Sequence, residues 1–348
     1  MRCALVGLGR IGSLLEDDAL REKPATHAGA IAGNPDCELV AGCDTDAERR
    51  ERFRERWGCD PLYAEAGEML HQETKVGRGI DALFVATHPE SHLHMCRLAA
   101  AYRVPIVVCE KPLADTLRRA RGIKKLHRPP DLTILTNHER RYSKDYLNAR
   151  KTIRSGRLGR LLGVHGTLYF GSKMSHREVL LHDGTHMVDI INFLGAGRLT
   201  VRSVIGRMGR RRGSSYLYGV LERMPGRDAN ASGPDARSGE PVPVVIEVGS
   251  DRDHLVFEVT LSCSEGRLRV GNGVYAVEES RESPYYEGYR SLIPLASESS
   301  GPTGYFANMV ADAVACFREP GREPVSSALH GYEVMEFICS WRRIFKRT

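Results

Sequence analysis

The chain has 348 residues, of which 41% are hydrophobic and 27% charged, and its net charge is +6. Single hydrophobic cores usually stop growing at about 250–300 residues, so this length predicts two domains. The sequence has no run of about 18 apolar residues, which argues against a membrane span. Basic and aromatic residues are not interleaved as nucleic-acid stacking platforms require, so no nucleic-acid partner is expected.

The cysteines indicate a reducing compartment. Nine are present, an odd number, with no CxxC pair, and Cys3, Cys43 and Cys109 lie in apolar, strand-like runs. This pattern favours reduced thiols in a cytoplasmic protein. Metal-ligand spacing is lacking among them, so no bound metal is expected. The first strand pattern begins at Arg2, which leaves no room for a signal peptide.

The first part of the chain alternates apolar runs with amphipathic stretches. Strands are expected at residues 3–6, 38–43, 82–86, 104–109 and 132–136. Helices are expected at 45–57, where Thr45 would cap the first turn, and at 91–102. This alternation predicts a Rossmann domain, a doubly wound parallel sheet with crossover helices, over residues 1–138.

The pattern changes beyond residue 138. Strands joined by short polar turns are expected at 161–170, 199–207, 242–249, 254–263 and 266–270. Helices are expected at about 143–155, 182–194, 304–317 and 330–344. Residues 139–348 are therefore predicted to form an α+β domain with a broad, mostly antiparallel open sheet for substrate binding and oligomerisation. The segment 224–241, rich in Gly, Pro, Ser, Asp and Asn, is expected to be a mobile surface loop.

A glycine-rich loop, GLGRIG at residues 7–12, follows the first strand. In this setting Gly7 would permit a tight turn, Gly9 would let a pyrophosphate approach the backbone, and Gly12 would allow close packing of helix on strand. The N–H groups of Arg10 and Ile11 would point at the phosphates, helped by the helix dipole. The loop therefore predicts a dinucleotide site.

Asp44 ends the second strand and bears on which dinucleotide binds. A carboxylate there accepts hydrogen bonds from the adenosine ribose hydroxyls and repels a 2′-phosphate, which favours NAD over NADP. Asp44 could also cap the following helix. Arg49 and Arg50 lie nearby and could still accept a phosphate, so NADP stays the less favoured alternative.

The separation between the glycine loop and Asp44 exceeds the usual spacing of about 20 residues. The excess indicates an insertion at residues 14–25, which interrupts the first helix and is expected to project near the cofactor or substrate mouth. Thr26 and His27 would then restart the helix.

These motifs resemble the Gfo/Idh/MocA family, named after glucose-fructose oxidoreductase and inositol dehydrogenase. The resemblance covers nearly the whole chain and is weakest between about residues 205 and 300. It implies a Rossmann domain, an open α/β substrate domain, and oxidation or reduction of sugars, inositols or nucleotide-sugars with a pyridine nucleotide. The matching stretches are GLGRIG at 7–12, GCD at 42–44, VATHPESH at 85–92, CEKPLA at 109–114, NHERRY at 137–142 and HDGTHMVDIINFLG at 182–195.

Lys111 follows a predicted strand in the sequence Glu110-Lys111-Pro112. The resemblance implies that Lys111 contacts the reacting hydroxyl or carbonyl and tunes its proton transfer. A partly desolvated lysine beside a cationic nicotinamide is also suited to acid–base work on physical grounds. Alternatively, Lys111 only forms a salt bridge with Glu110. Glu110 is expected to be an orienting or a structural partner and to belong to the cofactor site.

His186 resembles the family's substrate-domain histidine, and this implies a general base that takes the hydroxyl proton. A helical histidine is more often a packed core residue, which is the alternative. Many family members have an aspartate four residues earlier, where this chain has His182, and Asp183 follows it. Both spacings share a helical face with His186. Asp183 is favoured as the further catalytic residue, and His182, Asp183 and His186 are expected to contact substrate.

Other contacts are expected on the same resemblance. Thr87, His88 and His92 would line the cofactor pocket, with a packing role as the alternative for His92. Substrate contacts are expected from Lys111 and from three residues that begin the second domain: Arg140, Arg141 and Tyr142. An ion-pair role is the alternative for the two arginines.

The leading hypothesis is an NAD(H)-dependent oxidoreductase acting on a polyhydroxylated small molecule. A non-catalytic dinucleotide sensor of the same fold and an NAD-using glycoside-cleaving enzyme are the alternatives. A sheet with one apolar, uncovered face would pair with another subunit, so a homodimer or homotetramer through the C-terminal sheet is expected. Candidate sheet positions are Val244, Ile246, Val256 and Val259.

Overall fold

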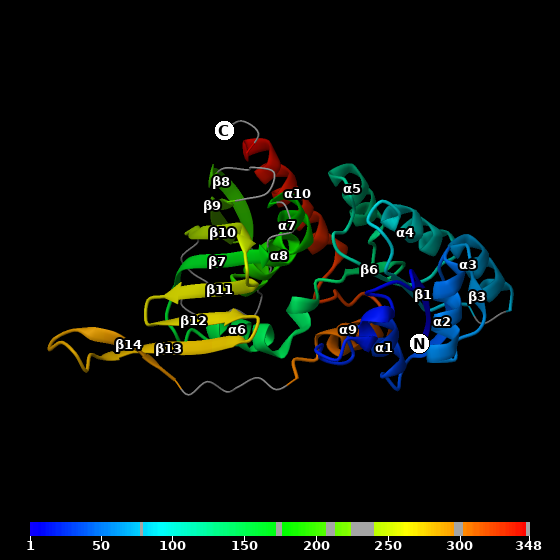
Figure 1. Cartoon of the computed structure of the whole chain (residues 1–348), viewed down its shortest axis with the longest axis horizontal. Helices are drawn as coiled ribbons and strands as arrows, with labels where there is room; N and C mark the ends of the chain where they lie inside the picture. The colour runs from blue at the N-terminus through cyan, green and yellow to red at the C-terminus, as the bar shows by residue number, and fades with distance from the viewer. Residues whose placement is uncertain (77–78, 172–175, 207–212, 224–239, 296–301, 346–348) are drawn as a thin grey trace. The chain divides into compact units, whose positions relative to one another are not determined.

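A computed structural model describes residues 1–76, 79–171, 176–206, 213–223, 240–295 and 302–345 (Figure 1). The chain divides into two compact units. Unit 1 comprises Met1–Ser143 and Pro302–Met335, and unit 2 comprises Lys144–Gly301 and Glu336–Thr348. The expected boundary at residue 138 lies close to this division, but segment 302–335 was expected in the second domain and packs in unit 1 instead.

Unit 1 contains a parallel sheet with the strand order β3-β2-β1-β4-β5-β6. Every neighbouring pair in it is parallel, so the predicted doubly wound sheet is confirmed. The central strands are almost wholly buried, as expected for a sheet covered on both faces. The strands are β1 (Arg2–Val6), β2 (Glu38–Cys43), β3 (Leu62–Tyr63), β4 (Ala82–Val85), β5 (Ile106–Cys109) and β6 (Thr133–Thr136).

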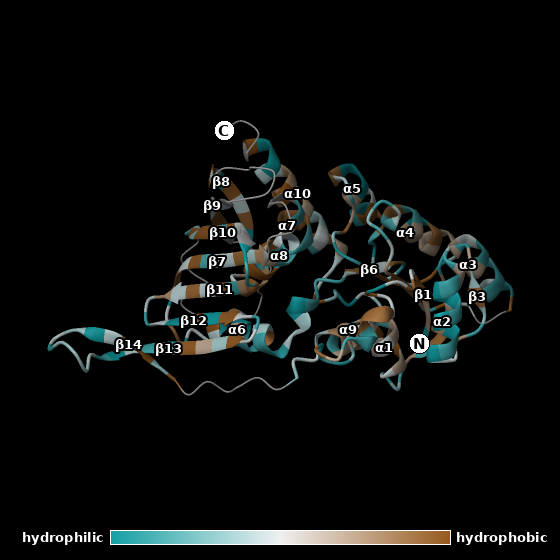
Figure 2. Cartoon of the chain, viewed as in Figure 1, coloured by the Kyte–Doolittle hydropathy of each residue, from teal (hydrophilic) through white to brown (hydrophobic). Residues whose placement is uncertain are grey.

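Helices cover both faces of this sheet. They are α1 (His27–Ala32), α2 (Ala47–Trp57), α3 (Ala66–Lys75), α4 (His92–Ala101), α5 (Leu117–Leu126) and α9 (Tyr305–Arg318), with short 3-10 helices η1 (Leu14–Asp17) and η2 (Glu139–Tyr142). Helix α2 is mostly hydrophilic in Figure 2, and Phe53 is its buried side chain. Its N-cap is Asp46, whose side chain accepts from the N–H groups of Glu48 and Arg49, so the expectation of a Thr45 cap was wrong.

Alternate residues of each strand pack into two separate cores, because successive strand side chains point to opposite faces. Ala4 and Val6 of β1 pack in one core, with residues of α3, α4 and α5. Cys3 and Leu5 pack in the other, with residues of α1 and α9. Helix α9 therefore completes the second face of the unit 1 sheet. Later residues of segment 302–335, Ala328, Tyr332 and Met335, pack in the first core, so the whole segment belongs to unit 1.

Unit 2 contains a sheet with the order β14-β13-β12-β11-β7-β10-β9-β8. Strands β7 and β10 are parallel and the other neighbouring pairs are antiparallel, which confirms a mostly antiparallel sheet. The strands are β7 (Leu161–Gly171), β8 (Gly197–Gly206), β9 (Gly213–Arg223), β10 (Val242–Arg252), β11 (Val256–Cys263), β12 (Gly266–Gly271), β13 (Val274–Glu282) and β14 (Arg290–Pro294).

The helices of unit 2 include one that the sequence did not predict. The helix expected at residues 182–194 corresponds to α8 (Gly184–Leu194), whose N-cap is Asp183. The helix before it, α7 (His176–His182), was not expected. Helix α6 (Lys144–Arg154) precedes β7, and α10 (Ala328–Phe345) begins in unit 1 and ends in unit 2.

Helix α8 covers one face of the unit 2 sheet. A side chain at Gly166 of β7 would meet Met187 and Ile191 of α8, so Gly166 faces that helix. Ile246 and Val259 pair with Gly166 in register and therefore share this buried face. Val244 is also buried, whereas Val256 is half-buried.

Three further expectations concern the loop at 224–241, membrane-spanning helices and the cysteines. Most of the expected loop 224–241 lies outside the described residues. Within the described ranges, no helix is both long and apolar enough to cross a membrane. All nine cysteines are free thiols.

Candidate cofactor and catalytic site

The predicted site residues of unit 1 gather at one edge of its sheet. The glycine loop follows β1, Asp44 follows β2, Thr87 follows β4 closely, and Lys111 follows β5. Carboxyl ends of parallel strands meet at the same edge, and β1 lies where the strand order reverses. In open α/β sheets ligands bind at such a switch point.

The glycine loop has the conformation that a dinucleotide cradle needs. Gly7 has a φ of 92°, and a Cβ there would lie 2.6 Å from Ala86 O. A Cβ on Gly12 would overlap Gly7 O, whereas the space beside Gly9 is open except for Arg49. Among the described residues, the N–H groups of Arg10 and Ile11 have no intramolecular acceptor, as at a helix N-terminus. These amides are therefore available to an anion, and the fit to a pyrophosphate is good.

The helical hydrogen-bond pattern resumes after residues 14–25. His27 N donates to Ile11 O (3.1 Å) and Ala28 N to Gly12 O (3.0 Å). With residues 14–25 left out, these are the i to i+4 bonds of one continuous α-helix. This geometry is consistent with an insertion at 14–25, and Thr26 caps the resumed helix by accepting from Gly29 N.

The insertion reaches the N-terminal end of α9. Glu22 accepts hydrogen bonds from Thr303 Oγ1 (2.9 Å) and from Gly304 N. Burial raises the pKa of the neighbouring Tyr305, and the charges of Glu139 and Glu22 raise it further. The insertion thus lies near η2, where substrate contacts were predicted.

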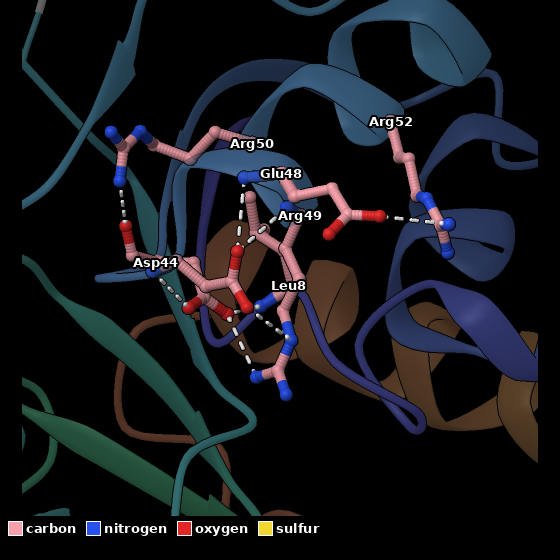
Figure 3. A network of polar contacts seen from close by, with 7 residues as sticks. Leu8, Asp44, Glu48, Arg49, Arg50 and Arg52 are labelled. Atoms are coloured by element: carbon pink, nitrogen blue, oxygen red, sulfur yellow. Dashed lines mark hydrogen bonds and ion pairs between the residues drawn. The ribbon is translucent and has the colours of Figure 1, made fainter.

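Asp44 is held in place by backbone amides (Figure 3). Its Oδ2 accepts from Leu8 N (2.8 Å) and its Oδ1 from Asp46 N (3.0 Å), with 8% of the residue exposed. Asp46 caps α2, so the cap role considered for Asp44 was wrong. A carboxylate oxygen accepts more than one bond, so both oxygens remain able to accept from ribose hydroxyls.

The two arginines near Asp44 differ in position. Arg50 Nη1 donates to Asp44 O (2.7 Å), which ties this side chain to the backbone. Arg49 Nη1 lies 3.6 Å from Asp44 Oδ2 (Figure 3), its side chain is 47% exposed, and it borders the space beside Gly9. Of the two arginines, Arg49 is therefore the one whose side chain stays accessible beside Asp44 and Gly9.

The residues after β4 form hydrogen bonds at the carboxyl edge of the sheet. Thr87 Oγ1 lies 2.6 Å from Ser91 Oγ, and His88 is exposed. His92 is fully buried, with Nε2 3.0 Å from Thr87 O and Nδ1 3.2 Å from Leu113 O. Burial lowers the pKa of His92. This geometry favours the packing role for His92.

The Glu110–Lys111 turn is supported from inside unit 1. Glu110 Oε1 lies 2.8 Å from His27 Nε2 and accepts from Asn137 Nδ2 (2.6 Å), and Oε2 accepts from Lys111 N (3.2 Å). Burial alone would raise the pKa of Glu110, but its hydrogen bond with His27 and the charge of His27 lower it. Glu110 is 6% exposed, so its carboxylate supports Lys111 from behind.

The predicted substrate residues of η2 are not equally accessible. Arg141 is 3% exposed and donates from Nη1 to Val325 O (2.9 Å). Tyr142 is also 3% exposed and donates from its hydroxyl to Asp312 Oδ2 (3.0 Å). These contacts favour structural roles, whereas Arg140 is partly exposed.

Sequence reasoning missed three residues near Lys111. His27 and Asn137 bind Glu110, and Glu139 interacts electrostatically with Lys111 and Arg140. Burial raises the pKa of Glu139, and these two positive charges oppose the rise. Asn137 and Glu139 belong to the NHERRY stretch, which directly follows strand β6. Their position after a strand end could therefore have identified them as candidate site residues.

In unit 2, His186 is 3% exposed on the first turn of α8. His182 Nδ1 lies 2.7 Å from Asp183 Oδ2, and the His182 side chain is 61% exposed. The structure therefore brings His182 and Asp183 together. Lys111 belongs to unit 1 and His186 to unit 2, so their convergence stays a prediction. No group of three or more metal-ligating side chains occurs in the described part of the chain.

The fold and the sheet-edge residues define unit 1 as a dinucleotide-binding Rossmann domain. Residues 1–138 match the Gfo/Idh/MocA model, described as an oxidoreductase family with an NAD-binding Rossmann fold. This NAD-binding region is the part of the chain that is similar to the Gfo/Idh/MocA oxidoreductases.

The chain is also similar to two named curated proteins. It is 28% identical over 160 residues to inositol 2-dehydrogenase of Rhizobium meliloti, covering 46% of this chain and 42% of that one. It is 26% identical over 199 residues to inositol 2-dehydrogenase of Salmonella typhimurium, covering 56% and 54%. The matched regions thus span about half the length of these curated relatives.

Solved structures extend the likeness in fold to the whole chain. Scyllo-inositol dehydrogenase of Lactobacillus casei, solved with NAD(H) and scyllo-inositol, matches with a TM-score of 0.71 and 15% identity, covering 100% of this chain and 97% of that one. At this identity the match shows that the two proteins share a fold.

Proposed function

We propose that the protein is an NAD(H)-dependent oxidoreductase that transfers hydride to or from a hydroxyl or carbonyl carbon of a sugar, an inositol or a nucleotide-sugar. The observation that carries the proposal is the position of Lys111 at the end of β5, on the sheet edge that holds the glycine loop and Asp44. The relatives named as inositol dehydrogenases support the polyol substrate class.

Each site residue has a proposed role. The amides of Arg10 and Ile11 would hold the pyrophosphate, Asp44 the adenosine ribose, and Thr87 and His88 the nicotinamide ribose. NAD, when bound, supplies the hydride acceptor or donor.

Proton transfer would be handled by residues of both units. In the oxidation direction His186 would take the hydroxyl proton, Asp183 would orient or polarise His186, and the Lys111 ammonium would contact the same oxygen. Arg140 and His182, both accessible within their own units, are proposed substrate contacts.

A lysine substitution tests this assignment. Lys111→Ala should leave the Kd for NADH unchanged and lower turnover by about 10²–10⁴-fold, because general acid–base contributions have this size. The matched control is Lys125→Ala, which removes an exposed lysine of α5 and should keep full turnover. Unchanged turnover in Lys111→Ala would refute the role.

A substrate panel separates the proposal from its rivals. Sugars, inositols, nucleotide-sugars and glycosides would be tested with NAD⁺ and, as ketones or aldehydes, with NADH. Tight NADH binding without turnover on any of them would favour a sensor, and glycoside cleavage without net NADH formation would favour the hydrolytic alternative. The nine free thiols support a reducing compartment such as the cytoplasm.

A further inference from the structure

A buried polar cluster lies behind Lys111 in unit 1. We call His27, Glu110 and Asn137 the His27 cluster; they come from α1, the end of β5 and the end of β6. His27 is 0% exposed, Asn137 1% and Glu110 6%. His27 and Glu110 are 83 positions apart along the chain, and Glu110 in turn accepts from the Lys111 amide.

His27 is enclosed by apolar rings. Its ring packs edge-on against Phe84 of β4 at 5.8 Å and Phe306 of α9 at 5.3 Å between centroids. Within the described residues its Nδ1 has no hydrogen-bond partner, so Glu110 is the one polar contact of this ring. A buried polar group is costly unless it is hydrogen-bonded, so the His27–Glu110 contact is strongly maintained.

Glu110 receives donors on both oxygens. His27 Nε2 and Asn137 Nδ2 lie at Oε1, and the Lys111 N–H donates to Oε2. A protonated carboxyl would place its own proton against one of these donors, so the arrangement suits the ionised form.

Further titratable groups act on the Glu110 carboxylate. They are the Lys111 ammonium, the Glu139 carboxyl of η2, the His92 imidazole of α4 and the Cys109 thiol of β5. His27 contributes more than any of these to lowering the pKa of Glu110, after the opposing effect of burial.

We propose that His27 is a positioning residue for Lys111: by bonding Glu110 it keeps the carboxylate ionised and in place, and this carboxylate fixes the Lys111 backbone. The inference rests on the proposed function in giving Lys111 the proton-transfer role. His92 holds the other side of the same turn through Leu113 O, so the lysine is fixed from two directions.

Two substitutions at one position separate positioning from packing. His27→Gln places an amide nitrogen near the site of Nε2 and retains a donor to Glu110, whereas His27→Leu removes the donor and fills the apolar space. The matched control is His94→Leu, which changes an exposed histidine of α4. For each variant, kcat and KM are measured across pH with the substrate that the wild type turns over, and the Kd for NADH is measured separately.

His27→Leu should lower kcat by about 10²-fold, the loss typical of a small misplacement of a reacting group. Its KM for substrate and its Kd for NADH should stay within about threefold of the wild type, because the glycine loop and Asp44 are untouched. The acid limb of its kcat–pH profile should move to higher pH. His27→Gln should restore most of kcat. Wild-type kcat and an unshifted profile in His27→Leu would overturn the proposal, as would equal losses in both variants.

A second readout does not depend on turnover. The Glu110 carboxyl titration, followed by ¹³C NMR, should move to higher pH in His27→Leu and less so in His27→Gln. An unmoved titration would overturn the proposal even if the wild type oxidised no substrate, a result that would separately refute the proposed function. If His27→Leu does not fold, Asn137→Ala removes the other donor to Oε1 and should show the same shifts, with about a tenfold loss of kcat; unchanged values there would overturn the role of the cluster.

Discussion

Glu110 combines a structural and an electrostatic role because its carboxylate is buried among donors. Its pKa in the folded protein lies below the ordinary value. A carboxylate with a depressed folded pKa stabilises the fold above its unfolded pKa, and this contribution is lost as pH falls through the folded pKa.

Glu110→Gln should therefore lower the free energy of unfolding at about pH 7 by about 1–3 kcal/mol, the cost of leaving buried donors poorly satisfied. The difference from the wild type should shrink as pH falls below about 4, where the wild-type carboxylate itself is lost. Urea unfolding at several pH values measures it, with the exposed Glu55→Gln of α2 as control. A pH-independent difference would contradict the ionised state.

Arg49 gives a prediction about cofactor choice. Its guanidinium stands beside Asp44 Oδ2 and Gly9, where a 2′-phosphate would come, whereas Arg50 is bonded to a carbonyl. Arg49→Ala should weaken NADPH binding about tenfold, the size of one charge-assisted hydrogen bond, and NADH binding less than threefold.

The matched control is Arg52→Ala, on the same helix and paired with Glu48 at 2.9 Å (Figure 3). Fluorescence titration gives both dissociation constants. Equal weakening of NADPH and NADH in Arg49→Ala would show that Arg49 does not read the 2′ position.

Several individual residues could be predicted from the sequence because their signal is local. Gly7, Gly12 and Asp44 follow strand patterns at motif spacing, and the structure gives each the expected backbone or carboxylate setting. His27 carried no such signal, since its partner Glu110 is far along the chain. Burial of Arg141 and Tyr142 likewise depends on α9 and Val325, which no local pattern connects to them.

The insertion at 14–25 is an element added to an otherwise continuous helix. Deleting residues 14–25 joins Ser13 to Thr26 and makes the His27 N to Ile11 O bond an ordinary helical one. The shortened protein should fold and bind NADH within about threefold of the wild type. Its free energy of unfolding should fall by about 1–2 kcal/mol, because the Glu22 bonds to Thr303 and Gly304 are lost.

Thermal unfolding and NADH titration of the deletion variant measure these effects, and Glu22→Gln isolates the bonds to α9. A deletion variant that failed to fold or lost NADH binding would show that the segment is part of the cradle.

Elements with strong apolar periodicity were predicted well, such as β2 and the strands of the mixed sheet near 161 and 266. Helices α3 and α5 and strands β9, β13 and β14 were not predicted. Helix α5 fully buries only Ala120 and Ile123, and half of its residues are Lys or Arg. Helix α7 was also not predicted, whereas the helix expected at 182–194 is α8.

For the whole molecule, the domain boundary could be located only from tertiary contacts. Segment 302–335 follows unit 2 in the sequence, yet α9 supplies a face of the unit 1 core. Sequence order alone assigns it to the nearer domain, and only packing of Phe306, Met309 and Val310 reveals the correct one.

Oligomer formation through the unit 2 sheet stays a prediction. Tyr216 and Tyr218 of β9 are 37% and 40% exposed, so that sheet offers aromatic surface to a second copy. Light scattering should report a dimer or tetramer, and Tyr218→Glu should shift it toward smaller species. Leu20→Glu, which alters a fully exposed apolar residue of unit 1, should leave the mass unchanged. A monomeric wild type would refute this prediction.

A crystal structure of the protein with NADH would test the proposed hydride chemistry. The nicotinamide C4 should lie at the end of β5, with Lys111 Nζ and the His186 ring both within about 3–4 Å of a substrate oxygen placed against it, as a reactive arrangement requires. A nicotinamide bound elsewhere, or Lys111 and His186 directed to different sites, would contradict the proposal.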